Sequence, residues 1–205
     1  MSGKGSNRCK DWPDYPIRVD SATGGLIGNT VIICGGGREV ADCYSLTSKK
    51  ATLATHMSVV RYFAASIVLN DNTLWVTGGL NVGGVLASTE YVTINRTLSG
   101  PDLPTALYRH AMVAINSSCS MVIGGYNEYQ PLQNKYSAST FYYDHIKGKW
   151  SNGPSLINER SGLVAGIVTD EVTNENFVLV TSNNKSSTEI LQDGKWVQGK
   201  IIDTL

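Results

Sequence analysis

The feature that most constrains this chain is a short apolar strand that ends in a pair of glycines and recurs along the sequence. Three copies keep both glycines and a fourth has Thr-Ser in their place; the copies are Thr30–Gly36, Thr73–Gly79, Cys119–Gly125 and Asn176–Ser182. The first positions of these pairs are 35, 78, 124 and 181, so the spacings are 43, 46 and 57 residues. Repetition at such a period indicates a fold built from stacked supersecondary units.

Other features recur in step with the glycine pairs. An apolar strand opened by an arginine precedes three of them, at Arg61, Arg109 and Arg160. A polar loop follows each pair and leads to a further strand, at 43–46, 88–94, 139–144 and 187–191. The last two repeats then carry Gly-Lys-Trp, which ends at Trp150 and Trp196. Each repeat is therefore predicted to form four short antiparallel strands.

Most of these repeated residues have a structural interpretation. A four-stranded sheet that is apolar on both faces cannot bury itself, so its stability must come from neighbouring sheets. Paired glycines permit positive φ and close approach of another backbone. We assign this role to Gly35, Gly36, Gly78, Gly79, Gly124 and Gly125. Trp150 and Trp196 are expected to pack between sheets, where large rings bury much area.

The order of strand, hairpin, Gly-Gly strand, loop, tyrosine strand and tryptophan strand resembles the kelch repeat of β-propellers. The resemblance covers roughly residues 24–205. It implies an all-β, kelch-type β-propeller with about four blades of four antiparallel strands, after a loose tail at 1–20. The blades are expected at approximately 21–56, 57–104, 105–154 and 155–205. Kelch propellers usually have five to seven blades, so we expect a partial or open propeller.

Composition argues against two classes of partner. Seventeen basic residues balance seventeen acidic ones, which leaves no electrostatic footprint for nucleic acid or an anionic membrane. No segment approaches 18 consecutive apolar residues, so no membrane span is expected. The remaining candidates are another protein or a glycan.

Two of the four cysteines flank one loop. Cys34 precedes the first glycine pair, and Cys43 opens the next strand. Facing positions on neighbouring strands permit a disulfide, although two buried thiols would also fit the sequence. Cys9 and Cys119 have no obvious partners, and four cysteines allow three connectivities.

The opening segment Cys9–Ile17, together with Cys34-Gly-Gly-Gly37 and Cys43-Tyr44, makes the chain similar to metazoan secreted kelch-domain proteins. That resemblance implies pairing of Cys34 with Cys43 and an extracellular location. A cytoplasmic location is the alternative, because no signal peptide opens this sequence. Three glycosylation sequons lie at predicted turns or loops and suit the extracellular setting; they begin at Asn95, Asn116 and Asn184.

The arginines Arg61, Arg109 and Arg160 are 48 and 51 residues apart. If they occupy the same phase of the repeat, they ring one mouth of the propeller. Kelch substrate receptors of cullin ligases use such arginines to clamp acidic peptides through bidentate bonds. By resemblance, the same face carries the loop 126–138, from which we add Tyr126, Glu128 and Tyr129 as candidate binding residues. The alternative is structural, with the arginines bonded to loop carbonyls at the entry of each blade.

The expected function is therefore that of a non-enzymatic kelch-repeat binding module for another protein or a glycan. Two alternatives share the scaffold: a substrate-receptor fragment of a cullin ubiquitin-ligase adaptor, and a carbohydrate enzyme that resembles galactose oxidase, which uses copper. We expect no catalytic residue, metal or cofactor. His56, His110 and His145 fall in different phases of the repeat without a local acid or nucleophile, and no Cys-x-x-Cys or His-x-x-x-His spacing occurs.

Overall fold

The computed structural model of the 205-residue chain describes residues 13–70, 72–127, 136–182 and 185–199. These residues form four antiparallel sheets of four strands, which we call blades 1 to 4, and one two-stranded hairpin. Within the described residues every regular element is a strand, as the all-β prediction requires.

The strands follow one another in chain order. Blade 1 holds β1 (Thr23–Ile27), β2 (Thr30–Cys34), β3 (Asp42–Leu46) and β4 (Ala51–His56). Blade 2 holds β5 (Ala65–Leu69), β6 (Thr73–Thr77), β9 (Thr89–Val92) and β10 (Thr97–Ser99). Blade 3 holds β11 (Ala111–Asn116), β12 (Cys119–Ile123), β13 (Thr140–Asp144) and β14 (Lys149–Asn152). Blade 4 holds β15 (Leu163–Thr169), β16 (Asn176–Ser182), β17 (Lys185–Gln192) and β18 (Lys195–Gln198), and the hairpin pairs β7 (Leu80–Asn81) with β8 (Gly84–Val85).

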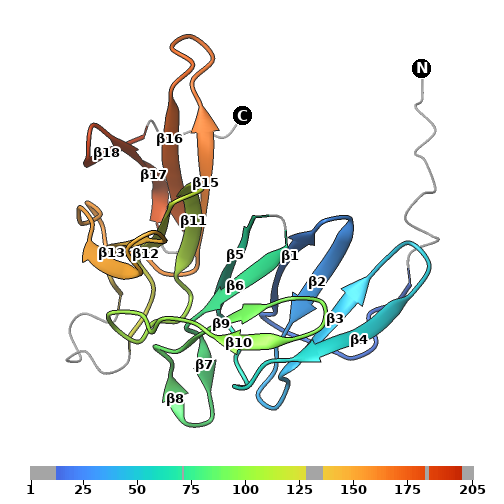
Figure 1. The fold of residues 1–205 in the computed structure, drawn as a ribbon. Coiled ribbons are helices and arrows are strands. Elements are labelled where there is room, and N and C mark those ends of the chain that lie inside the picture. Colours follow the sequence, from blue (N-terminus) through green and yellow to red (C-terminus); the bar gives the residue numbers. More distant parts are fainter. Residues whose placement is uncertain (1–12, 71, 128–135, 183–184, 200–205) are drawn as a thin grey trace, which may run out of the picture.

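The blades stand side by side around a common centre (Figure 1), with the first strand of each blade innermost. Strand β1 contacts β5, β5 contacts β11, and β11 contacts β15. This arrangement is that of a β-propeller whose ring is open, with blades 1 and 4 at the two ends of the arc. The prediction of a partial propeller is confirmed.

The hydrophobic core lies between blades rather than within them, because each sheet buries its faces against its neighbours. One cluster joins blades 1 and 2 and includes Ile32, Leu74 and Val76. A second joins blades 2 and 3 around Trp75, and a third joins blades 3 and 4 around Met121. Burial against a neighbour is therefore what stabilises each sheet.

The glycine pairs lie where one blade meets the next. All six glycines have positive φ, in the order Gly35 65°, Gly36 85°, Gly78 57°, Gly79 101°, Gly124 60° and Gly125 106°. The second glycine of each pair donates its N–H to a carbonyl of the following blade; the bonds are Gly36 to Arg61 at 3.2 Å, Gly79 to Leu107 at 2.8 Å, and Gly125 to Arg160 at 2.8 Å. A Cβ on the first glycine would collide with that same carbonyl oxygen, so a larger residue would separate the blades.

A second set of backbone bonds links the blades at the axis. One residue from each blade has left-handed φ, namely Ser21 at 61°, Phe63 at 55°, Arg109 at 54° and Gly162 at 59°. The N–H of each of the last three donates to the carbonyl of the residue before it in this set, at 3.0 Å for Phe63, 2.9 Å for Arg109 and 2.8 Å for Gly162. These four residues, which we call the axial chain, occupy equivalent positions in the four blades.

Candidate functional site

Arg61 lies in the connection between blades 1 and 2 and is buried. Its Nη2 donates to Glu90 Oε1 at 2.7 Å, and its Nη1 donates to the carbonyls of Gly78 at 2.7 Å and Ser88 at 2.9 Å. Glu90 also accepts from the backbone N–H groups of Ser58 at 2.6 Å and Val59 at 3.2 Å. This buried ion pair therefore holds the connection onto blade 2.

Arg160 repeats the arrangement between blades 3 and 4. Its side chain is fully buried, and its Nε donates to Glu189 Oε1 at 2.9 Å. Glu189 accepts from the backbone N–H groups of Ile157 at 2.7 Å and Asn158 at 3.1 Å. Both arginines therefore have a structural role, because neither guanidinium reaches solvent. Arg61 bonds loop carbonyls as the structural alternative expected, whereas Arg160 donates to Glu189 and to the hydroxyls of Ser182 and Ser187.

Arg109 does not occupy the position of the other two arginines. The second glycine of each pair donates its N–H to one carbonyl of the next blade. That carbonyl belongs to Arg61 in blade 2, Leu107 in blade 3 and Arg160 in blade 4, so Leu107 is the equivalent of Arg61. The expectation that three arginines share one phase is wrong, because Arg109 lies two residues further along. In blade 3, Leu107 and Phe141 belong to one buried apolar cluster, at the positions held by arginine and glutamate in blades 2 and 4.

Arg109 instead belongs to the axial chain and is exposed. Its Cζ lies 4.2 Å from the centroid of the Phe63 ring, a cation–π contact that holds the guanidinium against this ring. It forms no ion pair with another residue in the described part of the chain. Its hydrogen-bond donors are therefore available to a ligand.

A hollow of about 290 Å³ opens beside Arg109. Residues from all four blades line it, since it lies where their innermost strands converge; they are Ser21, Ala22, Phe63, Ala64, Arg109, His110, Gly162 and Leu163. We call it the axial cavity. The residues that blades 1, 2 and 4 contribute are all uncharged, so Arg109 supplies the positive charge of the cavity.

His110 also borders the axial cavity but is itself buried. Its Nε2 lies 2.8 Å from the Thr77 hydroxyl, and its Nδ1 has no hydrogen-bond partner among the described residues. Burial lowers the pKa of His110 to about 3, so the ring is neutral at physiological pH. His110 therefore adds no charge to the cavity.

A row of aromatic rings runs outward from Arg109 across the same face. Phe63 contacts Tyr62 at 5.3 Å and Tyr108 at 6.3 Å between ring centroids. Tyr108 meets Tyr126 edge-on at 4.7 Å, and Tyr126 meets Tyr136 at 6.0 Å. All five rings are partly or largely exposed. We call these five residues the aromatic row.

Short backbone bridges hold the aromatic row in place. Tyr126 donates its N–H to the Tyr108 carbonyl at 2.8 Å and accepts the N–H of Tyr108 at 3.1 Å. Tyr126 also bridges to Tyr136, and Tyr62 bridges to Leu80. Leu80 and Tyr126, which directly follow the second and third glycine pairs, are thereby fixed to the blade entries.

The sequence identified part of this surface. Arg109 and Tyr126 lie in it, whereas Glu128 and Tyr129 fall outside the described residues. Sequence reasoning missed the other four aromatic residues, Tyr62, Phe63, Tyr108 and Tyr136. A signal was available, because a tyrosine directly follows both Arg61 and Leu107.

The disulfide is buried at the glycine-pair end of blade 1, whereas the two described sequons lie away from this surface. Cys34 and Cys43 form a disulfide between facing positions of β2 and β3, as the resemblance implied, and Cys119 is the one free thiol in the described part of the chain. Asn95 in the turn between β9 and β10 and Asn116 at the end of β11 are exposed at the opposite end of their blades from the glycine pairs. Asn184 lies outside the described residues.

The tryptophans of the outer strands lie at blade interfaces. Trp196 is buried in the cluster that joins blades 3 and 4, and its Nε1 donates to the Pro154 carbonyl at 2.9 Å. Trp150 is half-buried and lies 5.7 Å from Trp75, centroid to centroid. Both therefore pack in the core.

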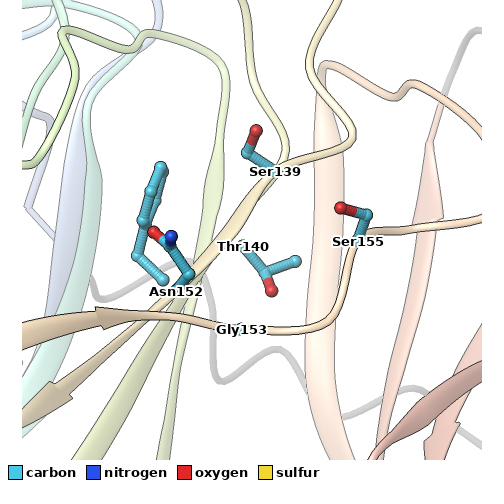
Figure 2. Close-up of a pocket in the computed structure, with 6 residues that line it drawn as sticks. Ser139, Thr140, Asn152, Gly153 and Ser155 are labelled. Carbon is cyan, nitrogen blue, oxygen red and sulfur yellow. The ribbon is translucent and has the colours of Figure 1, made fainter.

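A second hollow, of about 320 Å³, lies at the edge of blade 3 (Figure 2). The side chains of Ser139, Asn152 and Ser155 surround it, and Thr140 donates its hydroxyl to the Pro154 carbonyl at 2.8 Å. None of the six described residues that line it is ionisable. It offers hydrogen bonds but no charge, so the axial cavity is the stronger candidate.

No cluster of three or more histidine, cysteine, aspartate or glutamate side chains that could hold a metal ion occurs in the ranges that the structure describes. The same ranges contain no helix that could span a membrane.

Comparison with known proteins supports the kelch assignment of the fold. A family model described as the Kelch motif matches residues 106–157, which contain the strands of blade 3. No curated protein matches the chain. A solved structure titled "Structure of YjhT" is similar with a TM-score of 0.73 and 18% sequence identity, over 94% of this chain and 68% of that one. At this identity the likeness shows the fold: the chain is a kelch-type propeller arc.

Proposed function

We propose that the chain is a non-enzymatic binding module that holds an acidic segment of another protein at the axial cavity. The observation that carries this proposal is Arg109, an exposed cation oriented by Phe63 and without an ionic partner among the described residues. A guanidinium held in this way presents its donors in the fork that a carboxylate accepts.

The shape of the surface favours a polypeptide over a small molecule. The axial cavity, at about 290 Å³, is at the lower limit for sites that enclose small ligands. The aromatic row continues well beyond it, from Phe63 to Tyr136. Partly exposed tyrosines combine apolar contact area with a hydroxyl for hydrogen bonds, which suits an extended peptide. Loops on a rigid scaffold commonly serve this purpose.

Two features support a binding role over a catalytic one. The hydrogen-bonded pair Thr77 and His110 has the residue types of a nucleophile and a base, but both side chains are buried. The Nδ1 of His110 also lacks the orienting acid that such a pair requires. We therefore assign the pair to the core.

A glycan is the second candidate ligand. The observation that favours it is the row of exposed tyrosines, because the apolar C–H faces of sugars pack on aromatic rings. A neutral glycan would bind the row without needing Arg109. The two candidates therefore differ in their dependence on that residue.

We further propose an extracellular location. A disulfide between Cys34 and Cys43 is typical of oxidising compartments. The sequons at Asn95 and Asn116 are exposed at the end of the blades away from the aromatic row, so glycans there would leave the binding surface open. Secretion from eukaryotic cells followed by glycosidase treatment tests this, and a product with no mass shift would contradict it.

The binding proposal is tested with a fluorescein-labelled 12-residue peptide that carries a central Glu-Asp-Glu. Wild-type protein should bind it with an affinity that falls as salt is raised. Arg109→Glu should weaken binding by about tenfold or more, since hydrogen bonds to charged groups contribute about 1.5–3 kcal/mol. Absence of any binding by the wild type would refute the proposal.

Arg96→Glu is the matched control. Arg96 is exposed in the turn between β9 and β10, at the far end of blade 2 from Gly78, and its replacement changes the net charge equally. It should bind the peptide as the wild type does. Equal loss in both variants would show that net charge, and not the axial cavity, attracts the peptide.

A further inference from the structure

A third hollow, of about 430 Å³, lies between blades 1 and 2, at the end of the blades away from the glycine pairs. Ile27, the last residue of β1, lines it from blade 1. Two turns of blade 2, between β5 and β6 and between β9 and β10, supply the rest of the lining, which is Asn72, Thr93, Ile94, Asn95 and Arg96. The hollow shares no residue with the axial cavity or the aromatic row.

The equivalent turn of blade 3 fills the corresponding gap with one of its own side chains. Val92 in blade 2 and Tyr143 in blade 3 each pair with the residue four positions before a glycine pair. Two residues further on, Ile94 and His145 are therefore equivalent. The His145 ring lies 5.4 Å from the ring of Trp75, centroid to centroid, and so closes blade 3 onto blade 2. Ile94 is 39% exposed and borders the open hollow.

The hollow combines an apolar floor with a polar rim. Ile27, which is buried, and Ile94 supply the floor. The side chains of Asn72, Asn95 and Arg96 are exposed and form no hydrogen bond or ion pair with another described residue. A sugar ring has one apolar C–H face and a polar edge of hydroxyl groups. The hollow therefore matches a sugar better than it matches an apolar or a charged ligand.

We propose that the first N-acetylglucosamine of a glycan on Asn95 lies in this hollow, with its apolar face on the two isoleucines and its polar groups towards Asn72 and Arg96. Asn95 opens a sequon and itself lines the hollow, so an attached sugar begins there. The inference rests on the proposed extracellular location. In the attachment step, Asn95 Nδ2 forms a bond to C1 of the sugar and loses one proton, while a lipid diphosphate leaves C1 of the lipid-linked oligosaccharide donor.

Attachment at the rim removes the main cost of filling the hollow. A free sugar loses translational and rotational freedom when it binds, whereas a sugar linked to Asn95 has already lost most of it. Weak contacts with Ile27 and Ile94 therefore suffice to hold it. Because both blades line the hollow, these contacts stabilise the junction of blades 1 and 2 in the folded chain and are absent from the unfolded one.

Thermal unfolding of protein secreted from eukaryotic cells tests the proposal. Glycopeptide mass spectrometry should find Asn95 occupied, and an endoglycosidase then trims every glycan to one N-acetylglucosamine, so that outer sugars play no part. Asn95→Gln should unfold about 2–4 °C below the trimmed wild type, the shift expected of a modest contact in a domain of this size. The same variants exported to the bacterial periplasm, where disulfides form but this glycan is not added, should unfold together.

Two further variants separate a seated sugar from a general effect of glycosylation. Asn116→Gln is the matched control, because Asn116 opens an exposed sequon but does not line the hollow. Its glycan should add nothing beyond the shift that the same substitution causes in periplasmic protein. Ile94→Ser keeps the sequon at Asn95, and it should lower the melting temperature more in the trimmed glycoprotein than in the periplasmic protein.

The possible failures have different meanings. An unoccupied Asn95 in material that carries a glycan at Asn116 would overturn the inference and leave the extracellular location standing. Absence of a glycan at both positions would overturn both. An occupied Asn95 whose removal shifts the melting temperature no more than in periplasmic protein would show that the sugar points into solvent, and equal effects of Ile94→Ser in the two preparations would show the same.

Discussion

Replacing Arg61 with leucine removes a buried cation and leaves Glu90 with two backbone donors but no ionic partner. Both side chains are almost completely shielded from solvent, at 0% and 4% exposure, so water cannot replace the lost contact. Breaking a buried ion pair at one partner costs about 3–5 kcal/mol. We expect Arg61→Leu to lower the free energy of unfolding by an amount in that range.

Blade 3 shows how the same position is built without charge. There Leu107 replaces the arginine and Phe141 replaces the glutamate, while Pro104 stands where Ser58 donates its N–H in blade 2. Proline has no N–H to leave unpaired. We therefore expect the triple replacement Ser58→Pro/Arg61→Leu/Glu90→Phe to recover most of the lost stability, to within about 2 kcal/mol of the wild type, because apolar replacement of a whole buried pair is often neutral.

Urea unfolding followed by tryptophan fluorescence measures these differences, since Trp75 is buried at the interface of blades 2 and 3. The informative quantity is the coupling between the substitutions, which a cycle of single and combined variants isolates. If the triple variant loses as much stability as the sum of its single changes, the pair does not act as a replaceable unit. The equivalence with blade 3 would then fail as an explanation.

Two further predictions concern His110 and the disulfide. His110 has a folded pKa of about 3, below its unfolded value near 6.5, so the unfolded chain binds the extra proton and stability should fall by about 1.4 kcal/mol per pH unit as pH drops below 6.5. Urea unfolding at pH 7.5, 6 and 5 checks this slope, and His110→Gln should flatten it; an unchanged slope would contradict the assignment. Non-reducing mass spectrometry should find Cys34 linked to Cys43, and Cys34→Ala/Cys43→Ala should lower stability by about 2–3 kcal/mol, as expected for so short a loop. Two free thiols in native material would contradict the first of these.

The sequence could predict the blades because their signals are local. A glycine pair at the end of a five-residue, mainly apolar strand marks both a strand end and a close backbone contact, and this unit recurs with little change at Gly35, Gly78 and Gly124. The kelch-type fold and its partial ring followed from that repetition.

The candidate site was harder to predict because it depends on phase across the connections between blades. Apolar periodicity does not show where those connections begin. The sequence therefore suggests that Arg109 is the equivalent of Arg61, although the residue in the position of Arg61 is Leu107. A shift of two residues moves a side chain from a buried ion pair to the rim of the axial cavity. Contacts such as Tyr126 with Tyr136 join residues that are ten positions apart in the sequence, and no local pattern predicts them.

The axial chain has a consequence for how such arcs change length. Each of its three junctions is one backbone N–H bonded to the carbonyl of the preceding blade, so each junction is chemically the same as the last. A duplicated or deleted repeat would leave the remaining links intact, and no new side chain would be needed to rejoin them. Growth of the scaffold by whole repeats is thus separated from the evolution of the surface around Arg109, where a single residue decides the charge.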